Sequence, residues 1–138
     1  LAVHFAECCL PLPNENIIGV SESDVGVIIH NSNCKKLTED FEEDLWLTAT
    51  WKDIDENQLF TSRIKISVVN EPGSLGILAS HIGQNGGNII NLNISEKSND
   101  YFDMIFEINL KDLKHLNLII ENLRELDIVS MVKRFFIN

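Results

Sequence analysis

Polar and apolar residues follow two distinct periods along the second half of the chain. From Thr61 to Val69 they alternate at every second position, which predicts a strand with one buried face. After a turn over 70–73, apolar residues recur at the i, i+3, i+4 and i+7 spacing of one buried helical face. These residues are Leu75, Leu78, Ala79 and Ile82. Pro72 is expected near the first helical position, and Gly86 and Gly87 are expected to end the helix.

The remainder of the second half completes a βαββαβ order. The expected elements are strands over 89–94, 101–110 and 128–137 and a helix over 112–126. The apolar side chains expected on one side of that helix are Leu113, Leu116, Ile120 and Leu123. This order is the ferredoxin-like arrangement, in which a four-stranded antiparallel sheet carries two helices on one face. We therefore expect residues 61–138 to form one module that covers its open sheet face or its sheet edge with a partner, often a second copy of itself.

The first half predicts a smaller module over residues 1–55. The expected ranges are 11–16 for a loop, 17–20 and 25–30 for a β-hairpin, 35–43 for a helix and 45–51 for a third strand. Ser32 or Asn33 is expected to cap the helix. Trp46 and Trp51 should face opposite sides of the third strand. With a polar boundary at 52–58, the fold class is α+β: a β-hairpin, helix and strand module followed by a βαββαβ module.

The net charge of −10 is concentrated in the first half of the chain. Residues 1–60 carry three Lys or Arg against twelve Asp or Glu, whereas residues 61–138 carry eight against nine. No basic residue precedes Lys35, so the first half lacks the electrostatic footprint that binds nucleic-acid phosphates. No apolar run approaches the roughly 20 residues that span a bilayer, and the first residues do not form a signal peptide. We therefore expect a cytoplasmic location and no membrane contact.

Three cysteines and a histidine of the first module are candidate metal ligands: Cys8, Cys9, His30 and Cys34. An odd number of cysteines, two of them adjacent, does not predict a disulfide framework. The His-x3-Cys spacing lets two ligands converge across one turn. Adjacent cysteines of a strand point to opposite faces, however, so both reach one ion only if the backbone turns there. Buried cysteines are also common without a metal, and both interpretations stay open. A bound Zn²⁺ would be structural, because three thiolates and an imidazole leave no position for a catalytic water.

A small-ligand site in the second module would combine the turn and helix start with the beginning of the next strand. Its candidate residues are Asn70, Gly73, Ser74, Leu75, Gly76, Asn88, Ile89, Ile90 and Asn91. Free amides at a helix start can hold an amino-acid carboxylate, and glycine permits close approach. The simpler interpretation, which the sequence favours, is a helix-start turn and a helix end. The chain pairs no nucleophile with a base, so we expect it not to be an enzyme.

Two groups of motifs, in this order, resemble the RelA/SpoT family. The first group is HFAECCLPLP (4–13), IIGV (17–20), GVIIH (26–30) and Cys34, and it is similar to the family's cysteine-rich, zinc-finger or ribosome-intersubunit domain. The second group is NEPGSLGIL (70–78) and GNII (87–90), and it is similar to the ACT domain that ends those proteins. The ACT motif alone also occurs in many amino-acid enzymes and regulators. The pair in this order is therefore the more specific signal.

The resemblance implies the regulatory C-terminal fragment of a (p)ppGpp synthetase/hydrolase. The implied partners are the catalytic half of the parent protein, the ribosome with its tRNA, a branched-chain amino acid and a second copy joined through the ACT domain. The chain starts with Leu rather than Met, which fits a piece of a longer protein. Asn14-Glu15 and Asp24-Val25 stand where family members usually carry Gly-Asp and a basic residue, which favours a hydrolase-leaning or weakly ribosome-coupled relative. The alternative is an amino-acid-binding ACT module of another metabolic enzyme or regulator.

Overall fold

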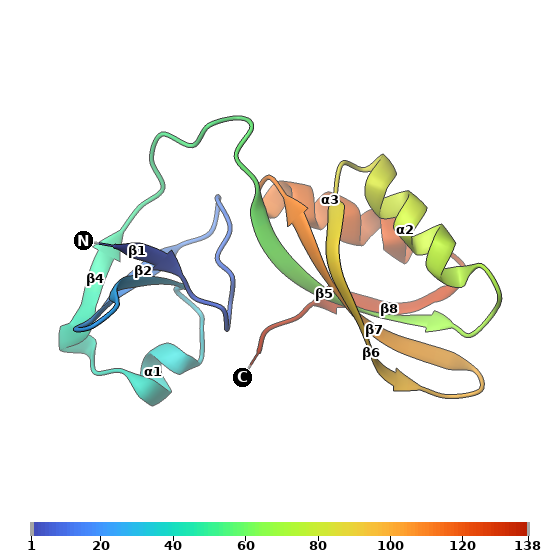
Figure 1. Cartoon of the computed structure of the whole chain (residues 1–138), viewed down its shortest axis with the longest axis horizontal. Coiled ribbons are helices and arrows are strands. Elements are labelled where there is room, and N and C mark those ends of the chain that lie inside the picture. Colours follow the sequence, from blue (N-terminus) through green and yellow to red (C-terminus); the bar gives the residue numbers. More distant parts are fainter. Residues whose placement is uncertain (1, 138) are drawn as a thin grey trace. The chain divides into compact units, whose positions relative to one another are not determined.

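The computed structural model describes residues 2–137 (Figure 1), and these form two compact units. The first unit holds residues 2–58 together with 136 and 137, and the second unit holds Leu59–Phe135. Each unit has its own sheet and its own buried apolar side chains. The α+β fold class expected from the sequence is confirmed. Within the described residues, no helix has the length and apolar character needed to cross a membrane.

The first unit is built on a four-stranded sheet in the order β1-β3-β2-β4. Its elements are β1 (Val3–Phe5), β2 (Ile17–Glu22), β3 (Gly26–Asn31), α1 (Lys36–Asp40), a 3-10 turn η1 (Glu43–Leu45) and β4 (Trp46–Ala49). The predicted hairpin is confirmed, since β2 and β3 pair antiparallel from Ile17 opposite Asn31 to Glu22 opposite Gly26. β1 was not among the expected elements; it is only three residues long and pairs parallel to β3.

Two local predictions for the first unit were wrong. Helix α1 begins at Lys36, and neither Ser32 nor Asn33 caps it, because the N-cap position is Lys35 and carries no side-chain hydrogen bond. Trp51 lies beyond the end of β4, so the alternation of a strand does not apply to it. Its ring stacks on Phe5 of β1, with centroids 5.6 Å apart. The chain after β4 therefore packs back onto its own sheet.

The second unit has the predicted βαββαβ order. Its elements are β5 (Phe60–Val69), α2 (Ser74–Gln84), β6 (Asn88–Lys97), β7 (Tyr101–Leu110), α3 (Leu113–Arg124) and β8 (Val129–Arg134). The antiparallel sheet has the order β6-β7-β5-β8, so β6 and β8 are its edges. Both helices lie against the same face and contact each other, with His81 Nδ1 3.0 Å from Asn122 Oδ1 (Figure 1). The ferredoxin-like arrangement is confirmed.

The core of the second unit lies between this sheet face and the two helices. Its fully buried side chains include Ile64, Ile66, Phe106, Ile108, Leu78, Ile82, Leu116 and Ile119. The prediction that Leu75 belongs to the buried helix face was wrong, because its side chain is 45% exposed. Helix α2 starts only at Ser74, after Gly73 in the left-handed region (φ +87°), and Pro72 precedes this N-cap. The first turn of the helix therefore does not bury Leu75.

The sheet face away from the helices is polar. Arg63 of β5 donates from Nε to Glu107 Oε2 of β7 at 2.9 Å, and Asn91 of β6 donates to the other carboxylate oxygen at 3.1 Å. Cross-strand hydrogen bonds of this kind stabilise a face without an apolar partner. Exposed apolar side chains lie instead on the edge strand β6, where Ile90 is 49% and Ile94 is 55% exposed. The exposed apolar side chains of this sheet thus lie on its edge rather than on its open face.

Candidate metal site and ligand-binding residues

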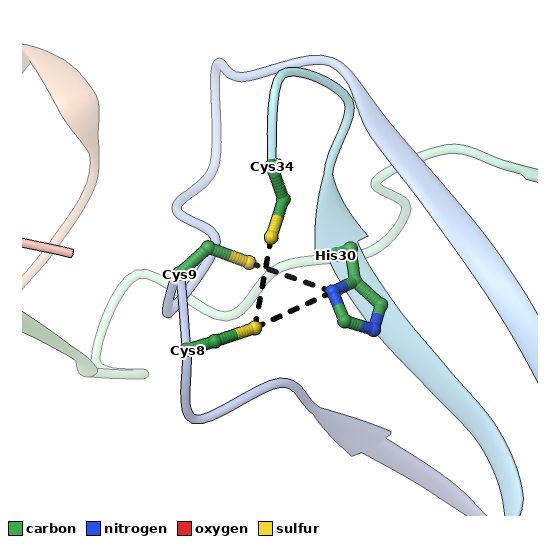
Figure 2. A group of neighbouring side chains, drawn as sticks. All are labelled: Cys8, Cys9, His30 and Cys34. Atoms are coloured by element: carbon green, nitrogen blue, oxygen red, sulfur yellow. Dashed lines mark hydrogen bonds between the residues drawn. The ribbon is translucent and has the colours of Figure 1, made fainter. Parts of the chain in front are cut away.

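The four candidate metal ligands of the first unit come together at one point (Figure 2). The Sγ atoms of Cys8, Cys9 and Cys34 and a ring nitrogen of His30 all lie within 4.8 Å of one another. Cys8 Sγ is 3.6 Å from Cys34 Sγ and 3.6 Å from His30 Nδ1, and Cys9 Sγ is 3.9 Å from the same nitrogen. The four side chains could hold a metal ion.

The local backbone explains how two adjacent cysteines reach the same point. The chain makes one turn after β1, in which the Leu10 N–H donates to the Ala6 carbonyl at 2.9 Å. Leu10 itself adopts φ +40°, a conformation that a leucine rarely takes. In a straight strand the two adjacent cysteine side chains would point to opposite faces, and this turn lets both point to the same side. The sequence left this question open because no glycine or asparagine marks the turn.

The other two ligands come from the end of β3 and the turn after it. His30 is the penultimate residue of β3, and its Nδ1 points toward the thiols (Figure 2). The Cys34 N–H donates to the Asn31 carbonyl at 2.9 Å, which closes a tight turn and returns Cys34 to the side of His30. The His-x3-Cys spacing therefore lets His30 and Cys34 converge across one turn, as the sequence predicted.

Burial shifts the pKa values of three of the candidate ligands. It raises the pKa of the Cys9 thiol, whose side chain is 3% exposed, and it raises the pKa of Cys8 together with the hydrogen bond to Cys34. Burial lowers the pKa of the His30 imidazole. All three shifts favour neutral groups because a charge is poorly solvated inside the protein. An ion that binds here must therefore displace protons from buried thiols, and this favours a soft metal with strong sulfur bonds.

The shortest separations between the ligand atoms are close to those around a tetrahedral ion. Zn²⁺ bonds of about 2.3 Å to sulfur and about 2.0 Å to nitrogen separate two sulfur ligands by roughly 3.8 Å. The separation of Cys8 Sγ and Cys34 Sγ, 3.6 Å, is close to this value. Three thiols and one imidazole also match the donor set of structural zinc sites. The Nε2 atom of His30 has no hydrogen-bond partner among the described residues, and the ring makes an edge contact with Phe41.

Two polar residues around the cluster were not singled out from the sequence. The Asn31 N–H donates to Cys9 Sγ at 3.2 Å, and the Asn31 amide donates to the Glu15 carboxylate. Asn31 was given no role of its own, and Glu15 was interpreted only as part of a loop and as a departure from a family pattern. The Asn-x-Asn-Cys sequence was the available signal, because asparagine side chains often organise such turns.

The candidate ligand residues of the second unit fall into two groups that do not meet within one chain. Asn70 lies beside the β6–β7 turn, where its side chain donates to the Ser98 carbonyl at 2.8 Å. Asn88 pairs with Asn109, which pairs with Thr61 at the opposite end of the sheet. Eight steps along β5 separate Thr61 from Val69, or roughly 27 Å. The turn and helix start therefore lie far from the first residues of β6.

Comparisons with known proteins match both units to described domains. The ACT domain family matches residues 56–134, and the RelA/SpoT RIS domain matches residues 1–52. The chain belongs to the ACT domain family, and the arrangement of an RIS domain followed by an ACT domain confirms the resemblance to RelA/SpoT proteins.

Similar curated proteins carry names from the same family. The chain is 36% identical over 126 residues to the GTP pyrophosphokinase rsh of Brucella abortus (strain 2308), covering 89% of the chain and 17% of that protein. It is 29% identical over 133 residues to the bifunctional (p)ppGpp synthase/hydrolase SpoT of Escherichia coli (strain K12), covering 96% of the chain and 19% of that protein. The chain thus spans less than a fifth of these relatives. A crystal structure of the ACT domain from GTP pyrophosphokinase of Chlorobium tepidum aligns at 22% identity and a TM-score of 0.49, over 56% of this chain and 100% of that one.

Proposed function

We propose that this chain is a regulatory region of a RelA/SpoT-type protein and controls its synthesis and hydrolysis of (p)ppGpp. The observation that carries the proposal is the succession of an RIS domain and an ACT domain in one chain. The similar proteins named GTP pyrophosphokinase and (p)ppGpp synthase/hydrolase support it. In this proposal, catalysis belongs to the remainder of the parent protein, and the chain acts on it by contact.

Charge favours the catalytic half of the parent over ribosomal RNA as the main contact. Residues 1–60 carry twelve acidic residues and three basic ones. Five of the acids lie close together around α1 and η1: Glu39, Asp40, Glu42, Glu43 and Asp44. An RNA contact by this unit would place phosphates against like charge, because RNA affinity depends on Lys and Arg. Ribosome and tRNA binding is accordingly the weaker route in this proposal.

The test compares three forms of the parent protein: intact, lacking residues 2–137, and carrying Cys34→Ser. We expect the ratio of (p)ppGpp synthesis to hydrolysis to change by about fivefold or more in both altered forms, the range of a typical coupling between sites. Glu56→Gln, an exposed change in the same unit but outside the acidic residues around α1 and η1, serves as the control and should leave the ratio unchanged. An unchanged ratio after removal of the whole chain would contradict a regulatory role. Co-sedimentation with ribosomes at moderate salt separates the two routes, since a strong salt-resistant association would favour the ribosome.

We further propose that the cluster of the first unit holds a structural Zn²⁺. The donor set and the spacing of the ligand atoms support this assignment. Cys8, Cys9, His30 and Cys34 would close the coordination shell, and the ion would join the turn after β1, the end of β3 and the turn after β3. Metal analysis of the purified chain should find one zinc per chain, and Cys34→Ser should lose it. A wild-type chain purified without any metal, which also fails to take up added Zn²⁺, would remove this assignment.

A second candidate function is binding of a branched-chain amino acid between two copies of the ACT domain. The separation of the two candidate groups favours it, because Asn88–Asn91 and Asn70–Gly76 lie at opposite ends of the sheet. Antiparallel pairing of two β6 edges would bring Asn88–Asn91 of one copy toward Asn70–Gly76 of the other. The exposed Ile90 and Ile94 on this edge are available for such pairing.

Calorimetry with valine, leucine and isoleucine tests this candidate, with sedimentation to report the oligomer. Ile94→Lys should abolish both the heat of binding and dimerisation, because a charge on an edge strand opposes pairing. Leu118→Lys, at an equally exposed position (55%) on α3, is the matched control and should change neither. Absence of heat from the wild-type chain with all three amino acids would exclude the candidate.

A further inference from the structure

Asn31 connects the two segments that carry the cysteines. Its backbone N–H donates to Cys9 Sγ at 3.2 Å, and its carbonyl accepts from the Cys34 N–H at 2.9 Å. Its side-chain Oδ1 accepts from the Asn33 N–H at 2.9 Å, which shapes the turn leading to Cys34. The residue is 7% exposed. One residue thus bonds directly to a candidate ligand and sets the conformation of the segment that bears another.

Glu15 holds the side chain of Asn31 in this position. One oxygen of its carboxylate accepts from the Leu12 N–H at 2.8 Å, and the other accepts from the Asn31 amide. Its own carbonyl accepts from the Trp51 indole at 3.0 Å. The carboxylate, which belongs to the loop after Cys9, therefore joins this loop to the turn before Cys34.

We propose that Glu15 is a positioning residue for the metal site, acting through Asn31, and that its carboxylate sets the affinity of the cluster for a thiophilic divalent cation. The inference rests on the metal site proposed above. Hydrogen bonds from a backbone amide stabilise a metal-bound thiolate, and outer partners of this kind typically change metal affinity by about 10–100-fold when removed. Glu15 fixes the donor of such a bond without contacting the cation.

Charge and hydrogen bonding predict opposite effects when this carboxylate is neutralised. Three thiolates and one neutral imidazole around a divalent ion carry a net charge of about −1, so a nearby carboxylate repels the loaded cluster. Removing its charge alone would therefore raise the affinity. Removing its hydrogen bonds frees the Asn31 side chain and lowers the affinity. The sign of the change thus identifies which role Glu15 has.

The experiment measures the Zn²⁺ dissociation constant of the chain by competition with a chromophoric chelator, and the visible spectrum of the Co²⁺ form. We expect Glu15→Gln to weaken Zn²⁺ binding by about 10–100-fold and to alter the thiolate bands of Co²⁺. The glutamine can accept from Leu12 N–H only by turning its amide donor toward the donor of Asn31. Glu39→Gln makes the same charge change on the exposed surface of the unit and should leave both readouts unchanged.

The double variant Glu15→Gln with Asn31→Asp reverses donor and acceptor. The new glutamine can then donate to the new aspartate, which still accepts from the Asn33 N–H, so most of the lost affinity should return. If the single variant does not fold, recovery of a folded, metal-binding chain in the double variant supports the proposal, and no recovery overturns it. Affinity within about twofold of wild type, or higher, in Glu15→Gln also overturns it. A wild-type chain that binds neither ion overturns the metal site itself, which is a distinguishable result.

Discussion

At Cys9, burial both hides the sulfur and raises the pKa of the thiol, whereas Cys8 and Cys34 are only partly buried. The thiolate is the reactive form, so a raised pKa and low exposure reduce the reactivity of Cys9 for the same reason. In the metal-free chain we expect Cys8 and Cys34 to react with iodoacetamide well before Cys9. Timed alkylation followed by peptide mass mapping measures this order.

Alkylation under two further conditions shows whether burial causes this order of reaction. Bound Zn²⁺ should protect all three cysteines, because each sulfur then donates its electrons to the metal. Alkylation in denaturant should remove the difference, since burial is lost. Equal rates for the three cysteines in the folded metal-free chain would show that Cys9 is not buried as described.

Asn14 carries a left-handed backbone conformation, with φ +80°, in the loop that leads to Glu15. Side chains with a Cβ atom are strained in this region, whereas glycine is not. Asn14→Ala and Asn14→Gly both remove the polar side chain, so their difference isolates the backbone strain. We expect the glycine variant to be more stable by about 1 kcal/mol. Chemical denaturation followed by tryptophan fluorescence gives both free energies of unfolding, and equal values would contradict the assigned conformation.

At the scale of elements, the sequence was most informative where a regular pattern was long. The predicted strand over 101–110 is β7 to the residue, because every second residue from Phe102 to Leu110 is apolar. The three residues of β1 are too few to show a period, and their partner β3 lies more than twenty positions away. Leu75 fits the helical period, but it lies in the first turn of α2, where its side chain stays exposed.

The ligand residues of the candidate metal site could be predicted from the sequence, but the turn and the contacts that hold them in place could not. Cysteine and histidine are distinctive ligands, and all four candidates come together. The turn at Leu10 was not predictable, because a leucine with positive φ contradicts local preference and is held by the surrounding structure. The contact of Glu15 with Asn31 joins residues sixteen positions apart and depends on tertiary structure. The candidate ligand residues of the second unit do not come together within one chain, because helix α2 carries the chain to the far end of the sheet. This separation also depends on tertiary structure.

The turn between α2 and β6 contains a glycine whose role is packing rather than backbone freedom. A Cβ atom on Gly87 would lie 2.9 Å from Ile82, 3.0 Å from Ile119 and 3.1 Å from Ile108, all side-chain atoms of the core. Gly83, in helix α2, has nothing within 4 Å of the same position. We expect Gly87→Ala to destabilise the second unit by about 1–3 kcal/mol, because a packed core resists an added methyl group.

Gly83→Ala is the matched control for that change. It should stabilise the unit by up to about 1 kcal/mol, since alanine is the better helix former. Thermal unfolding followed by the helical circular dichroism band measures both variants. Two variants that shift the midpoint in the same direction would contradict the packing described for Gly87.

At the scale of the whole molecule, the two units differ in what holds them together. The second unit has a sheet of long strands, two helices and a core that includes Ile64, Ile66 and Phe106. The first unit has shorter strands, a five-residue helix and few fully buried apolar side chains, among them Leu12, Val20 and Leu37. Small cores of this kind usually need a metal or disulfides for stability. The proposed ion would therefore contribute to the stability of the first unit alone.

Removal of the metal should consequently separate the unfolding of the two units. Both tryptophans, Trp46 and Trp51, belong to the first unit, so their fluorescence follows its unfolding. The helices α2 and α3 hold 11 and 12 residues against five in α1, so the helical circular dichroism band follows mainly the second unit. A ligand that binds only the folded form raises its stability, so a strong chelator should lower the midpoint reported by tryptophan and leave the helical midpoint unchanged. Added Zn²⁺ should restore the first midpoint. A chelator that shifts both midpoints together would mean that the ion stabilises the chain as one cooperative structure, against the division into two units.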